Sequence, residues 1–239
     1  MNFLSIPYRL GSFGSRNAPL LAGSLAALAL GVAAPQATSA ATLVDNLSAS
    51  TLGTSPFGGP GDTDWLAQSF TTTATDYILS SVTALIGNSN PATTGNYIFS
   101  IYDGSGPGGV PGVNLGDILS NSVTGIPTLA TSIQATASPL PLTLSPNTNY
   151  FLVLRTSGAN DALEWYSATN GSGTGFPTNF TSSSNGGTSW NAIDNTGPDQ
   201  MMQILATSPP PPTPAPLSIF GAAAAFGCSR RLRKRIGSN

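Results

Sequence analysis

The region from residue 41 to residue 208 consists of short runs of strand-forming residues separated by clusters of Gly, Pro, Asn and Ser. No segment of this region repeats its apolar residues every 3.6 positions, as an amphipathic helix would. Parallel strands need long crossover connections, which are usually helices, so the pattern favours antiparallel sheets. The clearest runs are 65–71, 77–86, 96–103, 149–156, 162–168 and 200–206, and the weaker runs are 41–47, 115–119, 128–133, 140–144 and 188–193.

About ten antiparallel strands in one region can bury their apolar residues between two sheets. The sequence therefore predicts an all-β fold, an antiparallel two-sheet β-sandwich of jelly-roll or Ig/fibronectin-III-like type. Successive side chains of a strand point to opposite faces, so Tyr97, Phe99 and Ile101 are expected to share one face of their strand.

Charged residues make up only 8% of the chain, and they are unevenly distributed along it. Residues 41–208 contain ten acidic residues and one basic residue, Arg155, which gives this region a formal net charge of −9. Such a surface repels phosphate backbones, so we expect no nucleic-acid binding. The chain has no histidine, and its one cysteine is Cys228. Ser-His-Asp and Cys-His catalysis are thereby excluded for residues 41–208, and we expect no enzyme activity.

The first 40 residues have the pattern of a secretory signal peptide. Arg9 and Arg16 give a basic start, residues 18–34 are apolar, and small residues follow at 38–41. This order predicts export and cleavage after Ala40 or Ala41.

The C-terminal end has three parts after the expected domain at 41–208. A proline-rich linker spans 209–216 and favours a stiff, extended polyproline II conformation. An apolar stretch begins at residue 217, and a basic cluster lies within the terminal segment 217–239. As a helix, residues 217–229 would be about 20 Å long, against roughly 30 Å of bilayer hydrocarbon. We therefore expect a transient membrane contact, with the basic cluster cytoplasmic and the domain outside.

This order of proline motif, short apolar helix and arginine cluster resembles the PEP-CTERM sorting tail of bacterial surface proteins. The resemblance implies recognition by an exosortase-type sorting enzyme and delivery to the cell surface or exopolysaccharide. The family's central glutamate is replaced here by Ala215. The residues that would form the sorting motif are Pro214, Ala215, Pro216, Arg230, Arg231, Arg233, Lys234 and Arg235.

The stretches 67–71, 77–83, 95–103 and 146–154 together resemble the choice-of-anchor family of bacterial extracellular domains, especially its R type. That family is defined by its pairing with varied surface anchors, and the resemblance implies location and fold but no activity. Residues 144–150 also resemble the tyrosine corner of fibronectin type III and Ig-like domains. By this resemblance the hydroxyl of Tyr150 would bond to backbone a few residues upstream.

Aromatic side chains could form a platform for a sugar. Trp165 shares a strand face with Leu163, so we expect it in the core, whereas Tyr166 falls on the other face with Glu164. Tyr166 and Trp190 are therefore the candidates for carbohydrate binding. Glu164 is the only glutamate and could act in a glycosidase carboxylate pair, but a solvated outward position is the simpler interpretation.

Asp62 and Asp64 follow the glycine-rich stretch 57–61 and could supply oxygen ligands to Ca²⁺. An Asx turn would account for them equally well. Calcium is the only cofactor that the sequence suggests. The glycine-rich stretch 104–112 lacks the ending of a phosphate loop and is interpreted as a hairpin loop.

These features predict a non-catalytic extracellular surface or matrix protein of a bacterial envelope. Its role would be structural, adhesive or polysaccharide-associating, with exopolysaccharide or other surface proteins as partners. The alternative is a carbohydrate-binding module with a defined sugar site near Tyr166 and Trp190.

Overall fold

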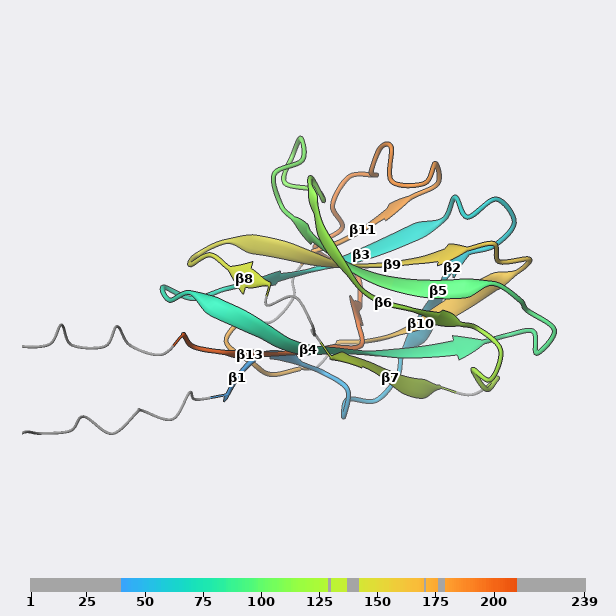
Figure 1. The fold of residues 1–239 in the computed structure, drawn as a ribbon, viewed down its shortest axis with the longest axis horizontal. Coiled ribbons are helices and arrows are strands. Elements are labelled where there is room, and N and C mark those ends of the chain that lie inside the picture. Colours follow the sequence, from blue (N-terminus) through green and yellow to red (C-terminus); the bar gives the residue numbers. More distant parts are fainter. Residues whose placement is uncertain (1–39, 129, 137–141, 170, 176–178, 210–239) are drawn as a thin grey trace, which may run out of the picture. The chain divides into compact units, whose positions relative to one another are not determined.

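The computed structural model describes residues 40–128, 130–136, 142–169, 171–175 and 179–209. These residues form thirteen β-strands and no helix, arranged as two antiparallel sheets (Figure 1). The predicted all-β, two-sheet β-sandwich is confirmed. No helix in this part of the chain is long and apolar enough to cross a membrane.

The larger sheet has eight strands. Its main order is β1-β13-β4-β10-β12, with β2 beside β10, and with β7 and β8 beside β4. Its strands are β1 (Ala40–Asp45), β2 (Gly53–Gly58), β4 (Tyr77–Asn88), β7 (Thr131–Thr136), β8 (Thr143–Leu144), β10 (Ala162–Ala168), β12 (Asp199–Gln200) and β13 (Met202–Thr207).

The smaller sheet has five strands in the order β11-β3-β9-β5-β6. Its strands are β3 (Trp65–Thr71), β5 (Asn96–Asp103), β6 (Asn114–Ser122), β9 (Asn149–Ser157) and β11 (Phe180–Ser183). The first and last strands of the fold pair directly, so that Ala40 lies opposite Thr207.

The core lies between the inner faces of the two sheets. From the smaller sheet it receives Phe99 and Ile101, and from the larger sheet Trp165 and Ile204, all fully buried. Tyr97, Phe99 and Ile101 do share the inner face of β5, as their alternation predicted. Several fully buried aromatic and aliphatic side chains of this size account for a stable fold without disulfides.

One bulge explains why the inward positions of β4 change parity. Leu79 pairs with Ala206 and Ser81 with the preceding residue of β13, so Ser80 is an extra residue. Leu79 therefore points into the core before the bulge, and Val82 does so after it.

A buried polar network also joins the sheets. The Gln200 backbone N–H donates to Gln68 Oε1 at 2.9 Å, and Gln200 Nε2 donates to Ser55 Oγ at 3.1 Å. Asn46 completes the network by donating to the Gln200 carbonyl at 3.1 Å and accepting from the Met202 N–H at 2.6 Å.

Several elements differ from the expectation, and β2 and β11 were not predicted at all. The run 188–193 is not a strand; this segment lies along the outer edge of β11, where Phe180 and Asp194 exchange two backbone hydrogen bonds. The expected run 200–206 is split into β12 and β13 at Met201.

Candidate functional site

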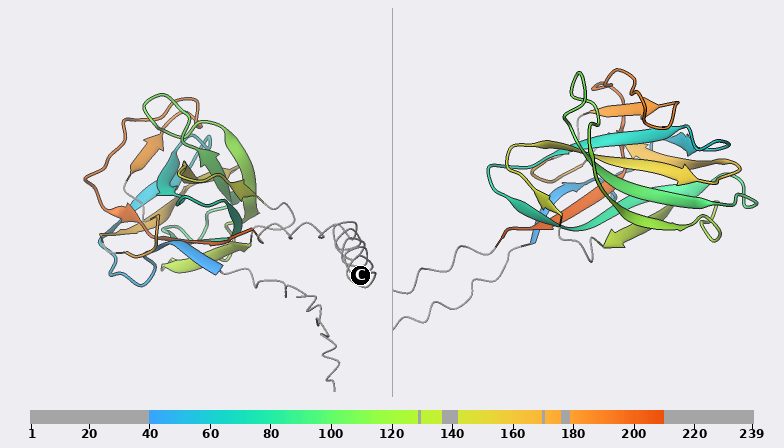
Figure 2. Two further views of the ribbon diagram at one scale, coloured as in Figure 1. Left: turned by 90° about the vertical axis from the view of Figure 1, so that its left-hand side faces the viewer. Right: turned by 45° about the horizontal axis from the view of Figure 1, so that its top comes forward.

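Two loops enclose a groove on the outer side of the smaller sheet. The 104–113 loop joins β5 to β6, and the 184–198 segment joins β11 to β12; both project beside each other (Figure 2). The groove has a volume of about 370 Å³ and is lined by residues 106, 107 and 110–112 of the first loop and 187–190 of the second. We call it the tryptophan groove, because Trp190 is its only aromatic lining residue.

Trp190 is held in place by other aromatic side chains. Its ring meets Trp65 at 6.4 Å and Tyr102 at 6.5 Å between centroids, both edge-on. These rings pack on the buried side chains of Ala67, Phe151 and Val153, which form the outer face of β3 and β9. Trp190 is half-buried, so part of its indole stays accessible in the groove.

Asp103 shapes the first wall of the groove. Its Oδ1 accepts hydrogen bonds from Ser105 Oγ at 2.6 Å, from the Ser105 N–H at 3.2 Å and from the Val113 N–H at 2.8 Å. The two ends of the 104–113 loop are thus fixed to one carboxylate. Burial opposes ionisation of this carboxyl, but these bonds outweigh it and lower the pKa of Asp103.

Asn185 shapes the second wall. Its Oδ1 accepts from the Ser189 N–H at 2.9 Å and from Ser183 Oγ at 2.9 Å, while its Nδ2 donates to Ser189 Oγ at 2.7 Å. Gly187 has a φ of +77°, and a β-carbon there would overlap the ring of Trp65. Only glycine fits this position without strain.

The nearest ion pair lies under this aromatic cluster. Arg155 Nη2 donates to Asp117 Oδ2 at 2.7 Å, and the guanidinium lies 5.1 Å from the Trp65 ring centroid. Burial opposes ionisation of Asp117, but hydrogen bonds from Ser100 and Asn114 and the contact with Arg155 lower its pKa. The one basic residue of the domain is therefore already engaged by a carboxylate and a ring.

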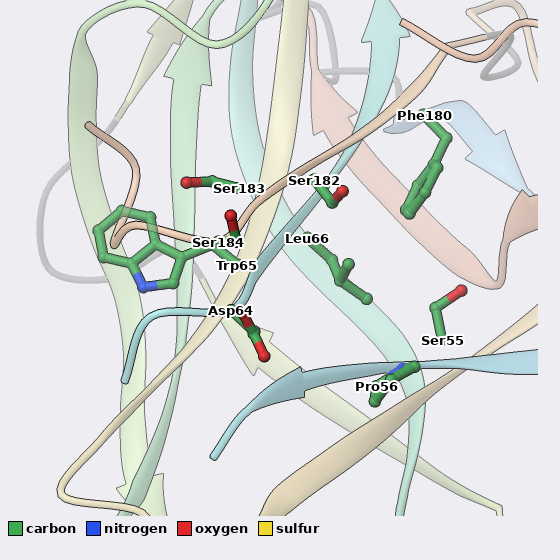
Figure 3. A pocket seen from close by; sticks show the side chains of 9 residues that line it. All are labelled: Ser55, Pro56, Asp64, Trp65, Leu66, Phe180, Ser182, Ser183 and Ser184. Atoms are coloured by element: carbon green, nitrogen blue, oxygen red, sulfur yellow. The ribbon is translucent and has the colours of Figure 1, made fainter. Parts of the chain in front are cut away.

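A second hollow of about 310 Å³ lies where β2, β3 and β11 meet. We call it the edge hollow. Leu66 lies at its centre, Phe180, Ser55 and Pro56 lie on one side, and Ser182, Ser184 and Asp64 lie on the other; the indole of Trp65 points away from it (Figure 3). It combines an apolar floor with serine hydroxyls and one exposed carboxylate.

The structure does not bring the two predicted sugar-binding residues together. Tyr166 lies on β10 of the larger sheet, and because its neighbour Trp165 is in the core, Tyr166 faces outward from that sheet. Trp190 packs on the outer face of the smaller sheet. The prediction of a single sugar site that contains both residues was therefore wrong. Trp165 itself is fully buried and donates from Nε1 to the Met201 carbonyl at 3.0 Å.

Glu164 is half-buried on the same outward face as Tyr166, where it lies opposite Pro56 and Gly87 of the neighbouring strands. It belongs to the larger sheet, whereas the tryptophan groove lies on the smaller sheet.

Asp62 serves to join two loops. Its carboxylate accepts hydrogen bonds from Thr156 Oγ1 at 2.8 Å, from the Gly158 N–H at 2.6 Å and from the Ala159 N–H at 3.2 Å. Burial opposes ionisation, but these bonds outweigh it and lower the pKa of Asp62. Asp64 is exposed in the adjoining edge hollow. Within the described ranges no group of three or more acidic, histidine or cysteine side chains could hold a metal ion, so calcium at Asp62 and Asp64 stays a prediction.

Tyr150 has the contact expected of a tyrosine corner. Its buried hydroxyl accepts a hydrogen bond of 2.7 Å from the backbone N–H of Ser145, five residues upstream. Its ring stacks on Phe70 at 5.7 Å. The corner is also tied to β3 by Thr72, whose Oγ1 donates to the Ser145 carbonyl at 2.6 Å.

The bracing of Trp190 by Trp65 and Tyr102 was not predicted from the sequence. A strand at 188–193, as expected, does not predict this contact. The one available signal was the alternation of β3, which places Trp65 on the outer face because its neighbour Leu66 points inward. The sorting-motif residues and nearly all of the predicted signal peptide, linker and tail lie outside the described residues.

No protein-family model matches the chain, and no curated protein matches it. Seven chains of solved structures do match. One is the VP2 subviral particle of infectious bursal disease virus, with 12% identity and a TM-score of 0.29 over 85% of this chain and 51% of that chain. Another is the Gt strain of the same virus, with 13% identity and a TM-score of 0.27 over 83% of this chain and 49% of that chain. The chain thus spans about half the length of these two structures.

Proposed function

We propose that this protein is a non-catalytic, exported bacterial protein that is displayed at the cell surface or in the surrounding polysaccharide. Its sandwich domain would have a structural or adhesive role, held near the envelope by the C-terminal tail.

One observation carries the proposal. The predicted export signal and the predicted sorting tail flank a domain whose first and last strands pair, with Ala40 opposite Thr207. Removal of a leader at Ala40 or Ala41 would leave most of β1 in place, and a tail after Thr207 would leave the sheet at the same end of the β1–β13 pair. Such a domain can be cut at one end and tethered at the other without rebuilding its core.

The non-catalytic part of the proposal is supported by the chemistry available. The chain has no histidine, the domain has no cysteine, and its one glutamate lies on an outward strand face. The acidic side chains that the structure brings near the groove, Asp103 and Asp117, are occupied by hydrogen bonds within the domain.

The experiment is to express the full-length chain in a bacterium and to determine where in the cell it is located. A protease added to intact cells should digest it and spare a cytosolic marker protein. Mass spectrometry of the expressed protein, without added protease, should find a mature N-terminus at Ala41 or Thr42. A full-length chain that keeps Met1 and stays in the cytosolic fraction would overturn the proposal.

A further inference from the structure

We infer that the tryptophan groove is a binding site for a neutral polysaccharide chain. This deepens the proposed function, on which it rests only for access to extracellular glycans. The ligand class follows from the lining of the groove, from its charge and from the way its walls are fixed.

The lining suits a sugar ring better than it suits a wholly apolar ligand. A pyranose presents C–H groups on its faces and hydroxyls around its edge, and the C–H groups pack favourably on the electron-rich face of an indole. Trp190 supplies the indole, and Pro107, Val110 and Pro111 extend the apolar surface. Thr188, Ser189 and the glycine backbone supply hydrogen-bonding groups beside them.

The absence of charge in the lining selects against acidic sugars. None of the groove residues 106, 107, 110–112 and 187–190 carries a charge. Arg155 is the only basic residue between 41 and 208, and it is paired with Asp117. With a formal charge of −9 on that region, an anionic polysaccharide would meet repulsion and no available cation. A neutral chain meets neither obstacle.

Both walls are preformed, which lowers the entropic cost of binding. Asp103 closes the base of the 104–113 loop, and Asn185 closes the base of the 187–190 turn. Trp190 is braced by Trp65 and Tyr102, so its indole needs little ordering when a sugar arrives.

The edge hollow is the weaker candidate for this ligand. Its side chains include the exposed carboxylate of Asp64, and the ring of Trp65 points out of it (Figure 3). Phe180 and Leu66 there also belong to the core packing.

The test is binding of the purified full-length chain to an array of neutral and acidic glycans, followed by titration of the best neutral glycan. Trp190→Ala should weaken that binding by about 30-fold, as truncation of an aromatic anchor does. Trp190→Phe should keep most of the affinity, because it retains an aromatic face. Tyr166→Ala, on the outer face of the other sheet, is the matched control and should bind as the unaltered chain does.

Thermal unfolding of each variant separates loss of the site from loss of the fold. If Trp190→Ala does not fold, Thr188→Glu decides, because Thr188 is exposed in the groove and a charge there should weaken neutral-glycan binding without unfolding the domain. Binding of acidic glycans alone, binding of no glycan, or neutral binding that survives these changes would overturn the inference. None of these outcomes affects localisation, and a cytosolic location would overturn the proposed function while leaving the groove's affinity intact.

Discussion

Acidic side chains in this domain act mainly as organisers of backbone. Asp103 and Asp194 each accept hydrogen bonds from the backbone and hydroxyl groups of the turn that follows them, and Asp62 does the same across two loops. A carboxylate that accepts several N–H bonds replaces regular sheet pairing where the chain turns. Because residues 41–208 contain one basic residue, Arg155, which pairs with Asp117, these three carboxylates stabilise turns and not salt bridges.

Tyr150 tests the contribution of a single hydrogen bond. Tyr150→Phe keeps the stacking on Phe70 and removes only the acceptor for the Ser145 N–H. We expect a loss of about 1 kcal/mol of unfolding free energy, measured by urea denaturation. Water can reach the exposed Ser145, which keeps the loss moderate. Tyr166→Phe, at an outward and half-exposed ring, should change stability little. Equal stability of Tyr150→Phe and the unaltered chain would remove the corner's energetic role.

Asp199 predicts a pH dependence of the opposite sign to that of Asp62. Burial raises the pKa of Asp199 from 3.8 to about 6. The folded state therefore holds this proton more tightly than the unfolded state, and stability falls as the pH rises from about 4 through 6.

Asp199→Asn cannot ionise, so it should be more stable than the unaltered chain at pH 7 and equally stable at pH 4. After allowance for solvent screening of a partly exposed group we expect a gain of about 1 kcal/mol. Melting temperatures at the two pH values measure it. The exposed Asp76→Asn removes the same charge and serves as the control. A gain of equal size at both pH values would show that ionisation of Asp199 is not its cause.

At the scale of the strand, the bulge in β4 makes a sharper prediction. Deletion of Ser80 would turn Tyr77 and Leu79 outward while Val82 stays inward, or force the strand to slide against β13. Exposure of two buried side chains should cost about 4 kcal/mol or more. Deletion of Gly108, in an exposed part of the 104–113 loop, is the control for shortening the chain. Circular dichroism and urea titration compare the two, and a Ser80 deletion as stable as the Gly108 deletion would show that the bulge has no role in register.

The strands differ in how well their sequences predict them. β3, β5 and β10 have long alternating or apolar runs, and their predicted bounds agree with the structure. β2 was missed because Gly53, Pro56 and Gly58 are poor strand formers; it is tolerated because it pairs with β10 alone. β11 was missed because Phe180–Ser183 is mostly Thr and Ser, and its pairing with β3 decides its conformation.

At the scale of the whole molecule, the candidate site could be predicted only if the sheet that each residue joins were known. Strand alternation correctly separated Trp165 from Tyr166, since it is a local property. The position of Trp190 beside Trp65 and Tyr102 requires that β3 and β5 belong to one sheet and that the 184–198 segment packs on its outer face. No local pattern contains that information, which is why Tyr166 was grouped with Trp190.

The charge distribution of the whole chain predicts what the tail does. Residues 41–208 have a formal charge of −9 and would be repelled by anionic lipid headgroups, whereas residues 217–239 combine an apolar stretch with five basic residues. A chain that ends at Ser208 keeps all of β13, so it should melt at the same temperature as the full-length chain. It should nevertheless move from the envelope fraction to the medium, as measured by immunoblotting of both. Replacing only the five basic residues with serine should give partial release, because the apolar stretch remains. If the shortened chain stays with the envelope, the domain itself holds the protein there, and the tail is not its anchor.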